Sequence, residues 1–375
     1  MDMKKIYSAR VKKLAAYLKE NNIFAAFFED SERGRDVSVR YLTGMPSDAV
    51  LVVTCSGKAV LSPWDEILAS KKAFASKVIP FNKFSRDAAT ALKGILTSLD
   101  APENSTVSLP PSMSVLEFKK FKKEVPFVKL EVKEKGPHAY VKKCRAVKDD
   151  YEIECTKKAC SVTDEMTREI ECRLKKGLFT TETQVALYIE EHLRKRGCER
   201  TSFDTLAAGP SRSFAIHAFP GYTAGLWGSK GLSILDYGVC YEGYASDCTL
   251  TIAKGRLSKA QEEQLSLVQE AADKCLELYK PGLSIKKAAE KADEIFAAAQ
   301  RKMPHSLGHG TGLEIHEAPF VSLRADKKEV FLPGNIITLE PGLYDENLGG
   351  SRLENDVLIT ETGNLLLTSS KIIRI

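Results

Sequence analysis

The apolar positions in the first third of the chain switch between two periods. A repeat of 3.6 residues predicts amphipathic helices, whereas short apolar runs bounded by turns predict buried strands. Helices are expected at residues 6–20, 84–99 and 114–123. Strands are expected at residues 23–28, 77–81 and 106–109, with a pair across 49–61 around Ser56-Gly57. Because helices and strands alternate, the first part of the chain is predicted to be an α/β domain.

Gly136-Pro137 interrupts this pattern, and we place a domain boundary there, between residues 1–137 and 138–375. The second domain is expected to contain two successive halves, each made of helices followed by strands. The expected helices span residues 151–176, 181–195, 258–279 and 284–300, and strands are expected from residue 232 and again from 305 to 373. No repeat of residues links the two halves, so any twofold relation would be one of shape. The predicted fold class is therefore α/β (α+β).

The composition is that of a folded protein with two domains. Hydrophobic residues make up 43% and charged residues 28% of the 375 positions, which argues against disorder. The longest early apolar run, residues 23–28, is far shorter than the roughly 20 residues of a membrane-spanning helix. Charges recur early in the chain, where an export signal would be apolar, and the nine cysteines form no Cys-x-x-Cys pair. We therefore expect a cytoplasmic protein that has no membrane segment and no disulfide framework.

The net charge of +5 is divided unevenly along the chain. Residues 1–150 hold 27 Lys and Arg against 18 Asp and Glu, which gives +9 and leaves −4 for the remainder. The densest basic stretch, residues 119–123, could contact nucleic acid. Its spacing on a helix favours a solvated basic face with Phe121 turned inward. We therefore expect no nucleic-acid partner.

Two acids lie in segments that otherwise predict buried strands. A hairpin centred between Tyr241 and Glu242 would set Asp236 directly opposite Asp247. Opposed side chains in a hairpin have Cβ atoms about 4.5–5.5 Å apart. Two carboxylates that close repel each other unless a proton or a cation lies between them. This register predicts a metal site or a pair of acids that shares a proton.

A second pair of acids and a cluster of histidines extend this prediction. A loop about Asn347 would bring Glu340 and Glu354 together in the same way. Three of the six histidines lie within residues 305–316, and the glycines there would allow close backbone approach to a ligand, with His309 projecting inward. One imidazole beside four carboxylates is a mostly oxygen-donor set that suits two divalent ions.

These residues and their contexts resemble the ligands of the pita-bread metallopeptidases (peptidase family M24). The five matching positions are Asp236, Asp247, His309, Glu340 and Glu354. The segment Arg40-Tyr41-Leu42-Thr43-Gly44 and the pattern Arg145-x-x-Lys148-x-x-x-Glu152 resemble the proline-directed branch of that family, which includes prolidase and aminopeptidase P. The resemblance covers nearly the whole chain. It implies a creatinase-like N-terminal α/β domain followed by a pita-bread catalytic domain.

The resemblance also implies a reaction and its metals. The protein is expected to be an exopeptidase that uses two divalent ions, with Mn²⁺ first and Co²⁺, Zn²⁺ or Fe²⁺ also compatible, to cleave the bond between an N-terminal residue and a following proline. Asp236 and Asp247 would bind the first ion and bridge to the second, and the other three ligands would complete the pair. The ions would lower the pKa of a shared water, and Glu340 would act as general base.

Further roles follow from the same resemblance. His316 would stabilise the developing oxyanion, and His217 would close over the substrate, although an isolated histidine between apolar residues is more often a core group. His305 would shape the pocket, and Arg352 would orient ligands and substrate. Two other histidines stay outside the site: His192 on a helix surface and His138 in the linker. Among nearby cysteines, Cys248 is expected to pack away from the acids, and the role of Cys240 stays open.

Several alternatives remain open at this point. Dipeptides (prolidase) and longer peptides (aminopeptidase P) both fit, because the wall that separates them is not visible in the sequence. A metal-free, creatinase-like C–N hydrolase fits less well, since that branch has lost ligands that this chain keeps. A non-catalytic pita-bread module that binds peptides, histones or nucleic acid is supported mainly by the charge of +9. Ser306-Leu307 and Asn355 depart from the usual pattern without removing a ligand, and the family implies a homodimer.

Overall fold

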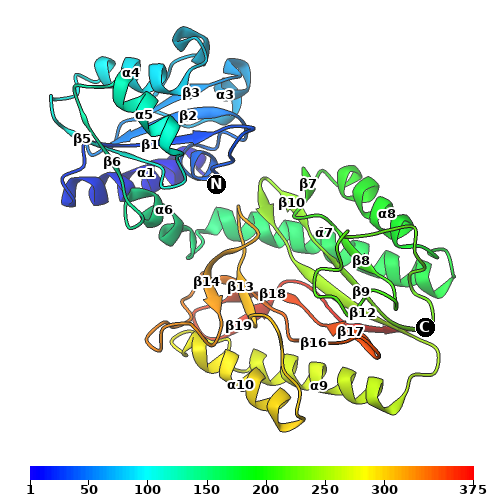
Figure 1. Cartoon of the computed structure of the whole chain (residues 1–375). Helices are drawn as coiled ribbons and strands as arrows, with labels where there is room; N and C mark the ends of the chain where they lie inside the picture. Colours follow the sequence, from blue (N-terminus) through cyan, green and yellow to red (C-terminus); the bar gives the residue numbers. More distant parts are fainter. The chain divides into compact units, whose positions relative to one another are not determined.

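The computed structural model describes all 375 residues and divides into two compact units, Met1–Cys144 and Arg145–Ile375 (Figure 1). The division falls near the end of α6 (Pro137–Arg145), later than residue 137, because the aromatic side chains of this helix contact the first unit. Tyr140 stacks on Tyr17 with ring centroids 4.3 Å apart, and His138 lies 4.5 Å from the ring of Phe28. His138 is therefore a buried helix residue and not a linker residue.

The first unit is a six-stranded sheet with helices, as the alternation predicts. Its strands run in the order β4-β3-β2-β1-β5-β6. They are β1 (Ala25–Asp30), β2 (Ala49–Thr54), β3 (Ala59–Pro63), β4 (Lys77–Val78), β5 (Thr106–Leu109) and β6 (Lys129–Val132). The helices are α1 (Met3–Glu20), α2 (Ser38–Thr43), α3 (Glu66–Lys72), α4 (Ala88–Ser98) and α5 (Val115–Glu124), with a 3₁₀ turn at Phe81–Phe84. The elements α2, α3 and β6 were not predicted, because four to seven residues are too few to establish a period.

The basic stretch of the first unit has the orientation that its helical spacing predicts. Phe121 is 3% exposed and meets Phe27 edge-on, with ring centroids 5.2 Å apart. The four lysines around it, at 119, 120, 122 and 123, are exposed. The stretch is therefore the solvated face of α5.

The second unit has two larger sheets and two pairs of helices, and Figure 1 shows one helix pair on each side of the strands. The helices are α7 (Asp150–Lys175), α8 (Glu182–Lys195), α9 (Lys259–Leu276) and α10 (Ile285–Ala298). One sheet has the order β20-β12-β9-β8 and the other the order β14-β13-β15-β18-β19. Their strands are β8 (Leu206–Ala208), β9 (Gly231–Tyr237), β12 (Cys248–Lys254) and β20 (Ile372–Arg374), then β13 (Gly308–Gly310), β14 (Glu317–Val321), β15 (Ile336–Leu339), β18 (Asn355–Ile359) and β19 (Asn364–Leu366).

Two smaller sheets complete this unit. One has the order β11-β10-β7, and the other is the hairpin β16-β17. The strands are β7 (Arg200–Thr201), β10 (Val239–Tyr241), β11 (Tyr244–Ala245), β16 (Gly342–Asp345) and β17 (Gly349–Arg352). Helices and strands thus alternate in the two halves that the sequence predicts. Every helix in the structure is either too short or too polar to cross a lipid bilayer.

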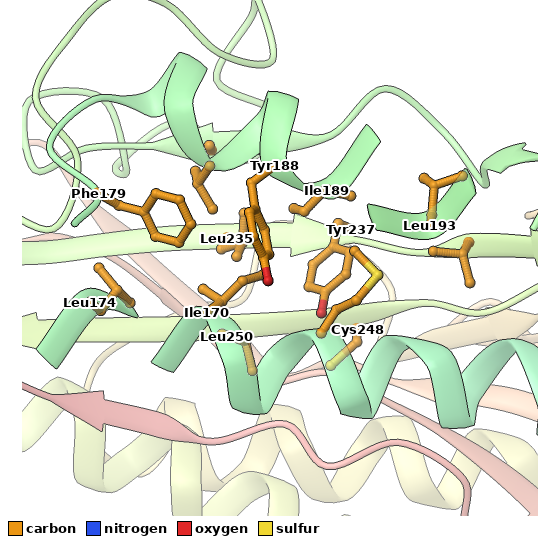
Figure 2. Close-up of a cluster of buried hydrophobic side chains, with 14 of the residues drawn as sticks. Ile170, Leu174, Phe179, Tyr188, Ile189, Leu193, Leu235, Tyr237, Cys248 and Leu250 are labelled. Carbon is orange, nitrogen blue, oxygen red and sulfur yellow. The ribbon is translucent and has the colours of Figure 1, made fainter. Parts of the chain in front are cut away.

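Each larger sheet packs one face on a helix pair. The core of the first half is shown in Figure 2, where Leu235 and Tyr237 of β9 and Cys248 and Leu250 of β12 lie among side chains of α7 and α8. Successive residues of a strand point to opposite faces, so Asp236 points away from this core. The packing position predicted for Cys248 is confirmed. A second core buries the other sheet against α9 and α10.

We predict that the stability of this first half depends on the buried side of α8. Ile189 is fully buried in the core of Figure 2, whereas Leu187 on the same helix is 55% exposed. Ile189→Ala is expected to lower the free energy of unfolding by about 2–5 kcal/mol. Leu187→Ala, the matched control, is expected to change it by less than about 0.5 kcal/mol. Urea unfolding followed by Trp227 fluorescence in a Trp64→Phe background measures both, because Trp227 lies in the same core. Equal losses of unfolding free energy in the two variants would contradict the dependence of stability on the buried side of α8.

Candidate metal centre

The centre of the second unit is a row of three residues that joins its two larger sheets. Asp236 of β9 pairs with Thr249 of β12, and Thr249 forms a single bridge with Glu354, which lies between β17 and β18. Directly opposed residues on antiparallel strands project to the same face. The Thr249 hydroxyl donates a hydrogen bond of 2.6 Å to Glu354 Oε2. The row therefore has an acid at each end, Asp236 and Glu354, and both acids project to the same face.

The prediction that Asp236 lies directly opposite Asp247 is wrong by two residues. The hairpin turn is at Glu242-Gly243, where both residues have positive φ (47° and 83°), so its centre lies one residue later than predicted. Asp236 consequently pairs with Thr249. Asp247 still joins the same cluster, because it is two positions from Thr249 and alternation returns its side chain to that face.

The prediction that a loop about Asn347 brings Glu340 and Glu354 together is confirmed. The hairpin β16-β17 pairs Gly342 with Arg352 on one side of the two acids. On the other side, β15 and β18 pair Leu339 with Asn355. Both ladders have the same register, so Glu340 and Glu354 occupy facing positions between them.

His309 of β13 lies among these acids. Its Nε2 is 3.7 Å from Asp247 Oδ2 and 3.6 Å from Glu340 Oε1. One ligand atom each from Asp247, His309 and Glu354 lies within 4.8 Å of the others. His309 Nδ1 is 3.2 Å from the carbonyl of Gly310, which can only accept a hydrogen bond, so the proton belongs on Nδ1. The Nε2 lone pair then faces the acids, as a metal ligand requires.

The glycines beside His309 allow close contact between neighbouring strands. A Cβ on Gly308 would lie 1.9 Å from the carbonyl oxygen of Thr338, and one on Gly310 would lie 2.3 Å from that of Ala318. Both glycines thus allow the neighbouring strands to approach closely. The close approach of this backbone to a ligand stays a prediction.

Burial makes the charges of the acids costly. Burial, followed by repulsion from neighbouring acids, raises the pKa of Asp247 and of Glu354 well above the usual range. The pKa of Glu340 is raised to about 8, mainly by burial. Asp236 Oδ1 and Asp247 Oδ1 are buried without a hydrogen-bond partner. Oxygen atoms without a donor, beside an imidazole lone pair, fit the coordination of divalent cations.

Arg352 lies at one edge of the cluster and connects several of its parts. Its Nη2 donates a hydrogen bond of 2.6 Å to Asp236 Oδ2, and its Nε donates one of 3.0 Å to the Thr249 hydroxyl. Its Nη1 donates to the Tyr344 hydroxyl at 2.6 Å and to the Ile216 carbonyl at 3.2 Å. The side chain of Arg352 is 3% exposed. This guanidinium thus fixes the direction of the Asp236 carboxylate.

The three other predicted histidines lie around the cluster. The ring of His316 is 4.2 Å from that of His309, and its residue is exposed. His305 Nε2 is 3.0 Å from the Tyr344 hydroxyl, and its Nδ1 is 3.7 Å from Glu340 Oε2. Burial, with the nearby charge of Arg352, lowers the pKa of His305 to about 4. His217 is exposed on the loop whose Ile216 carbonyl accepts from Arg352.

The loop that carries His217 is held by a partly buried ion pair. Arg212 donates hydrogen bonds to the Glu182 carboxylate and to the carbonyls of Ala218 and Pro220, on either side of an exposed Phe219. Glu182 also accepts from the backbone amide of Gly209 at 2.8 Å. The isolated core position considered for His217 is therefore not the one found. His217 belongs to an exposed loop with a fixed base.

Three contributors to the cluster were not identified from the sequence. They are Thr249, Tyr344 and Asp356, whose Oδ2 accepts the backbone amide of Asp247 at 2.7 Å. Asp356 also accepts from the thiol of Cys160 at 3.3 Å, and burial raises its pKa to about 7. A signal for Asp356 existed, because it follows Glu354 by two positions and so shares its face of the strand. Cys240 lies buried with its Sγ 3.8 Å from the Ser202 hydroxyl, in the small sheet.

Comparisons with known proteins cover both units. Residues 154–361 match Metallopeptidase family M24, and residues 10–147 match the Creatinase/Prolidase N-terminal domain. The chain is 32% identical to the Xaa-Pro dipeptidase of Pyrococcus furiosus over 368 residues, which are 96% of this chain and 98% of that protein. The X-Pro aminopeptidase of Thermotoga maritima aligns with a TM-score of 0.83 at 26% identity, over 98% of this chain and 99% of the other. The prolidase of Pyrococcus horikoshii aligns with a TM-score of 0.82 at 27% identity, over 96% and 98%.

We predict that the hydroxyl of Thr249 supports cation binding. Thr249→Val removes the hydrogen bond to Glu354 and is expected to weaken Mn²⁺ binding about 10- to 100-fold, as loss of such supporting partners does elsewhere. Thr251 is the matched control, since it is equally buried on β12 but donates to the Arg352 carbonyl instead. Thr251→Val is expected to lower stability with little change in Mn²⁺ affinity. Isothermal titration calorimetry measures the Mn²⁺ affinity of both variants. Equal affinities would contradict the role of Thr249.

We also predict how the stability of chelator-treated protein depends on pH. The raised pKa of Glu340, about 8, means that the folded state holds more protons than the unfolded state, so stability falls as pH rises toward 8. His305 and His309, with pKa values lowered to about 4 mainly by burial, act in the opposite direction, but only below about pH 6.5. The melting temperature is therefore expected to fall between pH 6.5 and 8, and less steeply in Glu340→Gln. Added Mn²⁺ should raise the melting temperature most at pH 8. A melting temperature that rises with pH in this window would contradict the raised pKa of Glu340.

Proposed function

The chain belongs to metallopeptidase family M24, and from this premise we propose that it hydrolyses the bond between an N-terminal residue and a following proline. The observation that carries the proposal is the convergence of three acids on His309, within a chain similar over nearly its full length to an Xaa-Pro dipeptidase. The likeness to an X-Pro aminopeptidase covers the same length. The reaction class is thus peptide hydrolysis at proline.

Two divalent cations fit the donor set that we assign to them. Asp236 and Asp247 would hold the first ion and reach the second, which His309, Glu340 and Glu354 would complete. Mn²⁺ is the ion we propose, and Co²⁺, Zn²⁺ or Fe²⁺ also suit carboxylate and imidazole ligands. When bound, the cations supply Lewis acidity for the peptide carbonyl and an acidified water as nucleophile.

The side chains of the site have separate tasks in this proposal. Glu340 has the most exposed side chain of the buried acids, at 16%, so its free oxygen can accept a proton from the attacking water. His316 lies on the open side of His309 and would donate a hydrogen bond to the developing oxyanion. Arg352 keeps Asp236 in place, and the Tyr344 hydroxyl beside it orients the ring of His305, which would shape the substrate pocket. His217 would approach the substrate from its loop.

The length of the peptide substrate is the finer question. Dipeptides and longer peptides share the scissile bond and the N-terminal residue, and they differ only beyond the proline. The relatives carry both activities in their names, dipeptidase and aminopeptidase. The homodimer and the cytoplasmic location expected from the sequence stay predictions.

We predict metal-dependent release of alanine from Ala-Pro or from Ala-Pro-Ala. Protein stripped by a chelator is expected to be inactive, and Mn²⁺ is expected to restore hydrolysis. Asp247→Asn, which keeps the size of the side chain but removes its charge, is expected to lower kcat/KM at least about 100-fold. Amino-acid analysis of released alanine measures both substrates, and their ratio separates a dipeptidase from an aminopeptidase.

Asp326→Asn serves as the control for removal of a carboxylate, because Asp326 is exposed whereas Asp247 is buried. It is expected to keep full activity. Full activity of chelated protein or of Asp247→Asn would refute the assigned metal chemistry. Bound Mn²⁺ without hydrolysis of either peptide would refute the assigned substrate.

A further inference from the structure

We propose that Arg145 is a positioning residue that sets His316 against the metal cluster, through the turn that carries this histidine. The inference rests on the proposed function, in which His316 contacts the scissile carbonyl. Arg145 itself touches none of the assigned ligands. Its effect is expected on the geometry of one catalytic group and not on the binding of metal.

Arg145 is buried and is bonded to both ends of the His316 turn. Its guanidinium is 2% exposed, and its Nη2 donates to Glu314 Oε2 at 2.7 Å and to Glu317 Oε1 at 2.6 Å. Glu314 precedes His316 by two residues, and Glu317 follows it directly. One nitrogen therefore ties together the carboxylates on both sides of the histidine. Charge-assisted hydrogen bonds of this length are among the stronger polar contacts in proteins.

The backbone of the turn depends on the same carboxylates. The amide of Glu314 donates to Glu317 Oε1 at 2.9 Å, which is the oxygen that Arg145 binds. The amide of Gly312 donates to the Glu314 carbonyl at 3.0 Å. The turn is thus closed by side-chain contacts in addition to its own backbone.

The neighbouring strand ladder is irregular at this turn. Gly310 pairs with Glu317, but the next pair is His309 with Phe320, so the register between β13 and β14 is interrupted there. Residues 311–316 follow directly from this irregular end of β13. Backbone hydrogen bonds to neighbouring segments hold the start of the turn, from the Thr311 amide to the Ile336 carbonyl at 3.1 Å and from the Ala245 amide to the Gly312 carbonyl at 2.8 Å. The Arg145 contacts restrain its other end, at Glu314 and Glu317 on either side of His316.

The backbone that follows Arg145 is itself held by hydrogen bonds. The amide of Lys148 donates to the Gly334 carbonyl at 2.9 Å, and the side chain of Asn335 donates to the Ala146 carbonyl at 2.8 Å. Burial raises the pKa of Glu317, but the charges of Arg145 and Lys148 outweigh this effect and the net pKa is lowered. Glu317 therefore stays ionised and keeps its hydrogen bonds.

Stability alone is a weak explanation for this group of charges. Replacing a buried ion pair by apolar side chains is often neutral or stabilising, because the charges must be removed from water. The contacts do, however, specify one arrangement of the turn. Displacement of a catalytic group by about 1 Å can cost about 100-fold in rate, so such a restraint has a measurable consequence.

The test is a double-mutant cycle between Arg145 and His316 on the full chain loaded with Mn²⁺. Arg145→Met is expected to lower kcat for Ala-Pro or Ala-Pro-Ala, whichever the wild type hydrolyses, by about 10- to 100-fold, with KM and Mn²⁺ affinity changed less than about threefold. In a His316→Ala background, the same change is expected to cost less than about twofold. Arg145→Lys is expected to recover part of kcat, since both hydrogen bonds come from one nitrogen. Equal losses in the two backgrounds would overturn the proposal.

Arg196→Met is the matched control. Arg196 also bridges two carboxylates in the second unit, with Nη2 at 2.7 Å from Glu169 Oε1 and Nε at 3.4 Å from Glu165 Oε2. It is expected to leave kcat unchanged. If Arg145→Met does not fold, Glu314→Gln replaces it, because Glu314 is 42% exposed and its loss breaks one of the same hydrogen bonds. A smaller loss of kcat that disappears in the His316→Ala background is then expected.

A spectroscopic measurement makes the proposal independent of the substrate. In protein with isotope-labelled histidines, the imidazole signals of His316, assigned with His316→Ala, are expected to shift in Arg145→Met. The imidazole signals of His192, whose ring stacks on Tyr188, are expected to remain unchanged. Unmoved His316 signals would refute the positioning role. Shifted His316 signals in Arg145→Met, together with wild-type protein that hydrolyses neither peptide, would refute the proposed function and leave the positioning role supported.

Discussion

The mutual repulsion of buried carboxylates is the constraint on which the second unit depends. Asp236, Asp247, Glu340 and Glu354 are brought into one cluster, where burial and neighbouring acids raise the pKa of the last three. Arg352 offsets part of this repulsion through its contact with Asp236. Such a cluster persists only if the surrounding backbone is too rigid for the acids to move apart. The two sheets provide that rigidity because each has a well-packed opposite face.

The two faces of each strand carry different residues, which explains why the site and the core can be so close together. In β9 and β12, one set of alternate residues packs on α7 and α8 (Figure 2), while the other set contains Asp236 and Thr249. The polar residues around the acids hold them in specific directions, as the Thr249 hydroxyl does for Glu354. The core therefore determines where the acids lie, and the hydrogen bonds determine how they point.

Local patterns in the sequence predicted much of this arrangement, and contacts between distant residues account for what they missed. The longer helices, the hairpin around Glu340 and Glu354 and the packing of Cys248 follow from periodicity and alternation. The pairing of Asp236 was misplaced because a turn with two positive φ angles at Glu242-Gly243 shifts the register by two. The contact of Arg145 with Glu317, 172 residues away, has no local signature. Only the folded chain brings such residues together.

The matching registers of the two ladders beside Glu340 and Glu354 have a consequence for how this protein can diversify. The pair is held from both sides, by Leu339 with Asn355 and by Gly342 with Arg352, so these ladders, and not the exposed tip at Glu346-Asn347 alone, set the spacing of the acids. Residues can be inserted or exchanged at that tip while the acids stay where they are. Evolution, or a protein engineer, can thus remodel the surroundings of the site without altering its chemistry.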